Sequence, residues 1–536
     1  MKNRFVVALL TILVAATACR KEEGIQVVEI SKGYPPMEQP KLLRANTDLE
    51  GETILGRKLE NPYTVEVMRK AATQISNKGF RLLDPDKIKA SHYYMKFMPT
   101  DSLQFQLLDN EKNLTLYPYP LDHEIIRTGN AYRDPAQGKD NYAWQYASVS
   151  INQRLNSRIV HQKLAELYIP EEDPTFSKGQ HEEYLDALLD EAYKITRNYQ
   201  DTLKSDKGIS QKKSYHPGGK IQIFDTRLNK LIGLEGVDMR ARRWFTTLHA
   251  QTDFWGNYRM ADTFKRPCNY SLWFSQSDFT VKPHLIDLTA WINGPKQKED
   301  WNVDINDGYN RFIGHIFRAA YRYSYGFIDG LKRPYSLASP RIWYIGVDDD
   351  MGNSGNNYIA VPVLRISRYH NGNIEYDSDE VFSTTCHETA HTSHARHMVL
   401  AALSFFTVSF WLQESWAIGV EWWVTKLEYK NTRGIPNYGD WSYLAPVQDP
   451  NYRAYQEWTH SYDWKYTNVY INIIDDFNEK ALFNTTDDNV KGYTLAYIDE
   501  NMLRHIFTLK TLRKQLKAHK PNGVTDADID KLLSYY

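Results

Sequence analysis

The feature that most constrains the fold of this chain is the segment from residue 383 to residue 424, which carries two consecutive helical patterns. The first pattern contains HETAH, so the rings of His387 and His391, four residues apart, project from one face of a helix. Twenty-two residues separate His391 from Glu414, the next carboxylate along the chain, which is enough for a second helix to fold back against the first. We therefore expect two helices packed side by side, with three side chains that could bind one metal ion.

This arrangement resembles that of the gluzincins, the clan of zinc peptidases that contains thermolysin. The resemblance implies that His387, His391 and Glu414 bind Zn²⁺. It also implies that Glu388, beside the first histidine, acts as the general base and accepts a proton from the attacking water. The activity that we expect is the zinc-dependent hydrolysis of peptide bonds.

Three further residues are candidates for supporting roles. Glu421 follows Glu414 by seven residues on the same helical face, so it either steadies a ligand histidine or lies on the surface. Gluzincins usually draw a histidine or tyrosine from the C-terminal side of the domain to stabilise the oxyanion. By their positions in the chain, His460 and Tyr493 are the candidates for that role, with a structural role as the alternative for each.

A second interpretation uses His397 as the third ligand in place of Glu414. The histidines at 387, 391 and 397 fit the metzincin spacing H-E-x-x-H-x-x-G-x-x-H except at one position, where His394 replaces the turn glycine. Glycine is favoured there because the helix must end and the chain must reverse in a conformation that is costly for other residues. No convincing Met-turn follows, so the pattern favours the gluzincin arrangement.

A function of another class is a further alternative. An HExxH sequence can occur by chance, and the chain would then be a surface binding lipoprotein whose metal site is structural or vestigial. Its abundant aromatic residues, 37 Tyr and 14 Trp, would in that case contact a glycan or a protein. Glu388 discriminates between the two functions, because it does not bind the metal and matters only for catalysis.

Residues 1–19 have the pattern of an export signal. Lys2 and Arg4 precede an apolar run that is too short to favour a membrane-spanning helix, and the segment ends in ATAC. This ending resembles a bacterial lipobox, which implies that Cys19 is lipidated and becomes the first residue of the mature chain. The following RKEE resembles the export signal of some Gram-negative surface lipoproteins. We therefore expect a lipid anchor in the outer membrane and a body on the cell surface, with an ordinary cleaved secretory signal as the alternative.

Composition limits the partners and the sources of stability. The formal net charge of -1 gives no overall field that would attract nucleic acid or an anionic membrane. The three cysteines, one of which is Cys19, do not make a disulfide framework, so stability must come from ordinary hydrophobic cores. We expect no nucleic-acid partner, membrane contact only through the lipid anchor, and an extracellular protein or glycoprotein as the substrate.

The expected fold class is α+β with several domains. After a proline-containing tether over 20–51, periodicity predicts an α+β module with a long helix over 52–207. Residues 208–284 resemble carboxypeptidase-regulatory-like β-sandwiches through the paired sequences LEGVDMRAR and TDFWGNY. Residues 285–536 are expected to form a thermolysin-like domain with a mixed sheet, the zinc-binding helices and a helical C-terminus. The C-terminal helices are expected over 466–479, 497–519 and 526–536.

The strand expected over 358–367 precedes the HETAH helix. In gluzincins the strand before that helix often borders the cleft and pairs with an extended substrate. No signature of a group that binds a peptide terminus accompanies the motif. We therefore expect cleavage inside an extended chain, with residues 358–367 supplying backbone hydrogen bonds.

Overall fold

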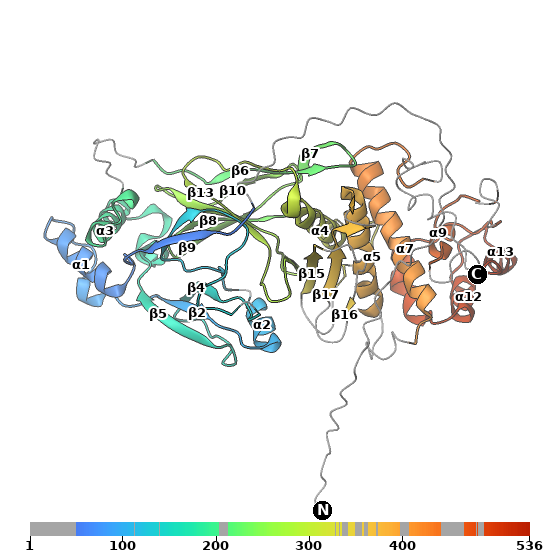
Figure 1. Cartoon of the computed structure of the whole chain (residues 1–536), viewed down its shortest axis with the longest axis horizontal. Helices are drawn as coiled ribbons and strands as arrows, with labels where there is room; N and C mark the ends of the chain where they lie inside the picture. The colour runs from blue at the N-terminus through green and yellow to red at the C-terminus, as the bar shows by residue number, and fades with distance from the viewer. Residues whose placement is uncertain are drawn as a thin grey trace, which may run out of the picture.

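The computed structural model shows a mixed α+β chain with several separate sheets, which confirms the expected fold class at this coarse level (Figure 1). Cys19 and the expected signal lie outside the residues that the structure describes, and so do His397 and His460. No helix within the described part is both long and apolar enough to cross a membrane. The described residues are 50–111, 113–138, 140–202, 213–326, 328–331, 333–334, 341–348, 356–357, 363–370, 374–396, 407–440, 466–478, 480 and 487–536.

The N-terminal module combines antiparallel sheets with helices at one end of the molecule (Figure 1). Helix α1 begins after Thr64, whose side chain accepts a hydrogen bond from the backbone N–H of Val67. The apolar faces of α1 and α3 share one core with β2. The strand orders are β1–β3 and β4–β2–β5. The elements are β1 (Ile54–Lys58), α1 (Val65–Ser76), β2 (His92–Phe97), α2 (Ser102–Asp109), β3 (His123–Arg127), β4 (Gln145–Ser150), β5 (His161–Leu167) and α3 (Glu182–Ile195).

The central part consists of sheets with the strand orders β13–β11–β8–β9 and β10–β6–β14, with β7 also paired to β6. Met239 and Ala241 of β8 and Ile223 of β6 belong to one core that both sheets share. The intervening side chains of β8 face the other way, and Arg240 and Arg242 donate to backbone carbonyls of the N-terminal module. The strands are β6 (Gly218–Asp225), β7 (Lys230–Gly233), β8 (Asp238–Arg243), β9 (Thr246–Gln251), β10 (Asn257–Arg259), β11 (Cys268–Trp273), β13 (Trp291–Gln297) and β14 (Val303–Ile305).

Strands on both sides of residue 284 belong to the same sheets. β13 and β14 follow that residue, and they pair with β11 and β6, which precede it. β12 (Phe279–Lys282) pairs in parallel with β15 (Ile342–Val347) of the next sheet. One core extends from β6 to β17, so the domain boundary expected between 284 and 285 does not coincide with a break in the sheets.

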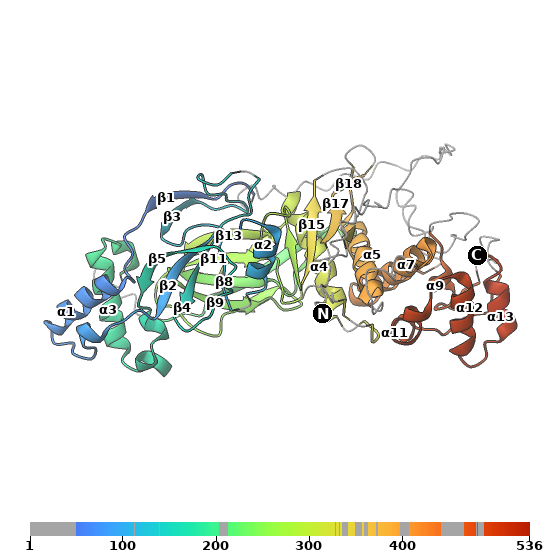
Figure 2. The same ribbon diagram turned by 90° about the horizontal axis from the view of Figure 1, so that it is seen from below.

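The next sheet has the strand order β12–β15–β17–β16, and α4 (Gly308–Tyr325) and α5 (Ser378–Arg396) pack against it (Figure 2). β17 (Val363–Ser367) lies between β15 and the antiparallel β16 (Asn356–Asn357). The strand expected over 358–367 is therefore not a free edge along its described part. The reason is that β16 pairs in antiparallel fashion with the first residues of β17.

The C-terminal part forms short helices, and the single helix expected over 497–519 is interrupted. A π-helical turn over Ile498–Met502 comes first, and α12 (Leu509–Ala518) begins anew after Thr508. Thr508 and Thr511 form a capping box, in which each side chain accepts a hydrogen bond from the backbone N–H of the other residue. The remaining helices are α9 (Val469–Asn472), α11 (Leu495–Tyr497) and α13 (Asp526–Leu532).

Candidate metal centre

Helices α5 and α7 (Phe410–Lys426) lie side by side and carry the candidate ligands (Figure 2). The sequence of α7 is apolar around most of its circumference, which is typical of a helix inside a core. Trp416 and Val420 of α7 are fully buried in the C-terminal core. On the opposite side of α5, the hydroxyls of Tyr344 and Thr389 are hydrogen-bonded at 2.9 Å and tie the helix to β15.

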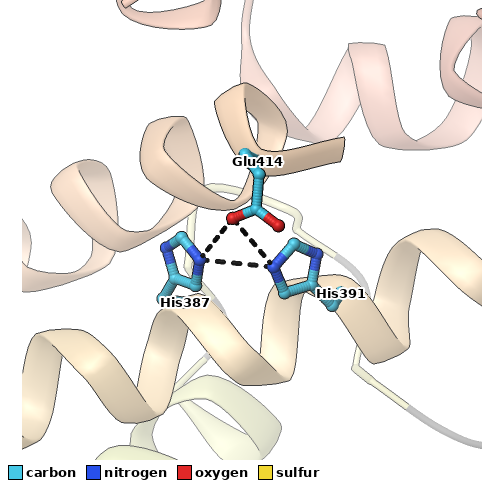
Figure 3. Close-up of side chains that lie close together, drawn as sticks. All are labelled: His387, His391 and Glu414. Atoms are coloured by element: carbon cyan, nitrogen blue, oxygen red, sulfur yellow. Dashed lines mark hydrogen bonds and ion pairs between the residues drawn. The ribbon is translucent and has the colours of Figure 1, made fainter. Parts of the chain in front are cut away.

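The polar ends of His387, His391 and Glu414 meet between these two helices (Figure 3). The Nε2 atoms of the histidines are 3.2 Å apart, and Glu414 Oε2 lies 3.2 Å from His387 Nε2 and 3.5 Å from His391 Nε2. All three side chains are buried. Tetrahedral zinc with bonds of about 2.0–2.1 Å needs ligand atoms about 3.3 Å apart. The three atoms therefore have the spacing that three ligands of one zinc ion require.

Glu421 lies beside a candidate ligand and not on the surface. Its Oε2 is 2.9 Å from His387 Nδ1, the ring nitrogen that faces away from Glu414. A carboxylate at this position accepts a hydrogen bond from Nδ1–H and so leaves Nε2 free of a proton for a metal. The seven-residue spacing puts Glu414 and Glu421 on one face of α7. Their carboxylates contact the two ring nitrogens of His387, Glu414 at Nε2 and Glu421 at Nδ1.

The cluster concentrates negative charge around the imidazoles. Burial disfavours a charged ring at His387, but the carboxylates of Glu414 and Glu421 outweigh it and hold the pKa of this histidine well above its usual value. Burial alone would raise the pKa of Glu414, whereas the charges and hydrogen bonds of the two histidines lower it. Such a site favours a positive charge at its centre, and a divalent cation supplies that charge without protonating the rings.

Glu388, the candidate base, follows the first ligand on α5 and is also buried. Adjacent helical residues are rotated by about 100°, so its carboxylate does not share the face of His387 and His391. The side chains whose ligand atoms lie close enough to share one metal ion are accordingly those of His387, His391 and Glu414, and Glu388 is not among them. This placement suits a residue that acts next to the metal rather than on it.

The structure places Tyr493 in the C-terminal core, in agreement with the structural role that was the alternative for it. Its hydroxyl donates to the carbonyl of Leu516 in α12 at 2.7 Å, and the residue is only 3% exposed within the C-terminal core. The hydroxyl is therefore already satisfied by α12. Tyr493 therefore serves the packing of the C-terminal helices, and we do not retain it as an oxyanion ligand.

The metzincin interpretation requires a chain reversal at residue 394. Helix α5 instead continues through His394 to Arg396, and His394 is fully buried within it. A helix that runs on at this point does not make the turn for which metzincins use glycine. The geometry of the described residues thus favours Glu414 as the third ligand.

A buried network of charges that the sequence did not reveal holds the first turn of α5. Asp379 accepts hydrogen bonds from Arg227 Nε at 2.5 Å and from the Tyr438 hydroxyl at 2.8 Å. Burial raises the pKa of Asp379 to about 6 against the opposing charge of Arg227. Nearby, Asp225 accepts a hydrogen bond from Arg318 of α4 at 2.6 Å. These partners are far apart in the chain, so no local spacing could have indicated them.

Two imidazoles and one carboxylate are a donor set typical of zinc in hydrolytic enzymes, where a further position is left to water or substrate. A buried carboxylate adjacent to the ligands adds the second requirement of such chemistry, a general base. The arrangement of α5 and α7 therefore carries the groups that metal-assisted hydrolysis needs.

Comparisons of the chain with models of protein families, with curated proteins and with solved structures find no match.

Proposed function

We propose that this chain is a zinc-dependent endopeptidase with a gluzincin arrangement of ligands. The observation that carries the proposal is the spacing of three buried ligand atoms, from His387, His391 and Glu414, at 3.2 to 3.5 Å from one another. The hydrogen bond of Glu421 to His387 supports it, because a metal-binding histidine normally has such a partner.

Each residue of the centre has a distinct role in this proposal. Zinc, when bound by His387, His391 and Glu414, supplies a Lewis acid that polarises the scissile carbonyl. Glu388 accepts a proton from the attacking water and returns it to the leaving amine. Glu421 fixes the tautomer and the orientation of the first histidine, so that Nε2 points at the metal position.

The proposal extends to the domain type, the substrate and the location. Residues 285–536 would contain a thermolysin-like domain, and the two central sheets would form a β-sandwich before it. An exported chain with a lipid on Cys19 would act at the outer membrane on extracellular proteins or glycoproteins. Among the described strands β16 lies at the edge of its sheet, and it offers the extended backbone to which a substrate chain would pair.

Metal analysis combined with two substitutions tests the centre. The purified chain should contain about one zinc per molecule, because the three ligands belong to one site. Glu414→Ala should abolish stoichiometric binding, because it removes one of those three ligands. Glu388→Gln should keep the zinc and lower peptidase activity by at least ~100-fold, because the amide is no base. Full zinc with unchanged affinity in Glu414→Ala would overturn the ligand set. A zinc-loaded wild-type chain that cleaves no protein would make the metal structural.

Mass spectrometry of the products tests the mode of cleavage. Unfolded and glycosylated proteins should be cut at internal bonds, because no sequence signature of a group that binds a peptide terminus accompanies the motif. Glu388→Gln is the matched control, because it keeps the centre intact and removes only the base. Stepwise loss of terminal residues would show an exopeptidase.

A further inference from the structure

A cavity of about 400 Å³ lies between the N-terminal module and the central sheets. A second hollow of about 510 Å³ shares Pro283, His284 and Tyr309 with it, so the two are adjacent. Ile345 of β15 lines the second hollow, whereas the neighbouring Tyr344 reaches α5. Successive residues of a strand point to opposite faces, so these hollows lie on the far side of the sheet from the metal centre.

The wall of the cavity contains a buried acceptor with no partner. Gln145 is 1% exposed and lines the cavity, and its Nε2 donates to the carbonyl of Ala143 at 3.3 Å. Its Oε1 is enclosed and accepts no hydrogen bond. An unpaired buried oxygen costs free energy, so a turn of the Gln145 amide that lets a ligand donate a hydrogen bond to Oε1 would remove that cost.

The charges around the cavity compensate one another. Asp287 Oδ1 lies 3.4 Å from Arg133 Nη2, and Nη1 of the same arginine donates to a backbone carbonyl. Lys282 donates to the carbonyl of Asp287 from behind, and Glu52 lies at the exposed rim. Two positive and two negative groups leave no net charge to attract an ion. They do present donors and acceptors together, which suits a ligand whose groups both donate and accept.

Aromatic side chains form the remaining wall. Tyr132 and Tyr309 are partly exposed, and behind them Trp291 stacks on Trp273 with ring centroids 5.8 Å apart. The hydroxyl of Tyr309 donates to the carbonyl of Gly346 at 2.8 Å, which holds this ring between the two hollows. Flat rings supply a rigid apolar surface at low entropic cost.

We infer that this cavity binds a neutral polyhydroxylated ring, the hexose unit of a saccharide. Asp287 accepts from its hydroxyls, Arg133 donates to them, and Tyr132 covers the apolar C–H face of the ring. A turn of the Gln145 amide brings Oε1 to one further hydroxyl. The volume falls in the range of small-molecule sites, and the second hollow accommodates the next sugar unit. This inference does not depend on the metal centre or on peptidase activity.

Calorimetric titration of the full chain with neutral methyl hexosides and with a matching oligosaccharide tests the inference. At least one sugar should bind, and the oligosaccharide should bind more tightly because it also fills the second hollow. Gln145→Met and Tyr132→Leu should each weaken binding by at least ~10-fold. Gln145→Met should change the melting temperature little, because removal of the unpaired acceptor offsets the loss of the long hydrogen bond from Nε2 to the carbonyl of Ala143. A purely structural glutamine would not combine weaker sugar binding with a nearly unchanged melting temperature.

Matched controls define the site. Tyr199→Ala removes a tyrosine that is 62% exposed outside the cavity, and Glu388→Gln removes the candidate base beside the metal centre, so both variants should bind the sugar normally. The oligosaccharide should bind equally well when free and when attached to a protein, because the cavity contacts only the sugar. Three results would overturn the inference: no binding of any sugar, binding that Gln145→Met and Tyr132→Leu leave unchanged, or tighter binding of methylammonium or arginine methyl ester than of every sugar.

Discussion

At the scale of single residues, the hydrogen bond between Glu421 and His387 makes the sharpest prediction. Glu421→Ala removes the acceptor of Nδ1–H, so the ring loses its orientation and zinc affinity should fall by about 10- to 100-fold. Glu421→Gln keeps an acceptor oxygen without the charge, and the loss should be smaller. Competition with a chelator at fixed pH measures both values. Glu166→Ala, at an exposed glutamate of β5, is the control that should leave affinity unchanged.

The same residue pair separates orientation from simple charge. If the carboxylate of Glu421 acted only by attracting the cation, the Gln and Ala variants would lose the same affinity. A graded loss, with Gln between wild type and Ala, is the expected outcome because the hydrogen bond and the charge both contribute. Wild-type affinity in Glu421→Ala would show that the contact has no role in metal binding.

At the scale of elements, the stability of the packing of α4 against β6 depends on pH through His315. Its Nε2 donates to the carbonyl of Phe224 at 3.0 Å, and burial lowers its pKa to about 3. Below pH ~6.5 the unfolded chain binds a proton at this histidine, whereas the folded chain does not until the pH approaches 3. The contribution of neutral His315 to the free energy of unfolding is therefore complete above pH ~6.5 and is lost as pH falls towards 3. The full effect is about 5 kcal/mol, of which about 2 kcal/mol is lost between pH 7 and pH 5.

The substitution His315→Gln isolates that effect. Glutamine can donate to the same carbonyl but does not titrate. The free energy of unfolding of the variant should therefore fall less than that of the wild type between pH 7 and pH 5. Chemical denaturation at the two pH values measures the difference, which should approach about 2 kcal/mol. His505→Gln, at an exposed histidine, should behave as the wild type. Equal pH dependence in His315→Gln and wild type would contradict the assignment.

At the scale of the whole molecule, the sheets define which fragments can fold. A fragment over 285–536 contains all the candidate metal ligands but lacks β6, β11 and β12, to which its own strands pair. It should show no cooperative thermal unfolding and bind no stoichiometric zinc. A fragment over 213–536 keeps both central sheets and should retain the metal, although it exposes the aromatic residues that face the N-terminal module. A folded, zinc-binding 285–536 fragment would show that the shared core is not required.

The sequence by itself determined the candidate metal centre, because that centre depends on helical periodicity. The spacing of His387 and His391 and the spacing of Glu414 and Glu421 place each pair on one face of a helix, whatever the rest of the chain does. An apolar pattern over α7 likewise requires an interior position. These relations act over one or two turns, and the amino-acid order specifies them directly. Where a local signal competed, as at Thr508, the cap of α12 interrupted a pattern that had indicated one longer helix.

Only the tertiary structure decided which distant segments meet. β14 pairs with β6 across more than seventy residues, so the central sheets and the last sheet share a core that no spacing indicates. The same is true of Tyr493 on α12, of Arg227 at Asp379, and of the cavity at Gln145, where the N-terminal module faces β13. Hydrogen bonds and cavities between such segments form only once packing has brought their surfaces together. The physical reason is that the burial of apolar area is not directional, so it does not specify which distant segments meet, whereas helical periodicity specifies which neighbouring residues share a face.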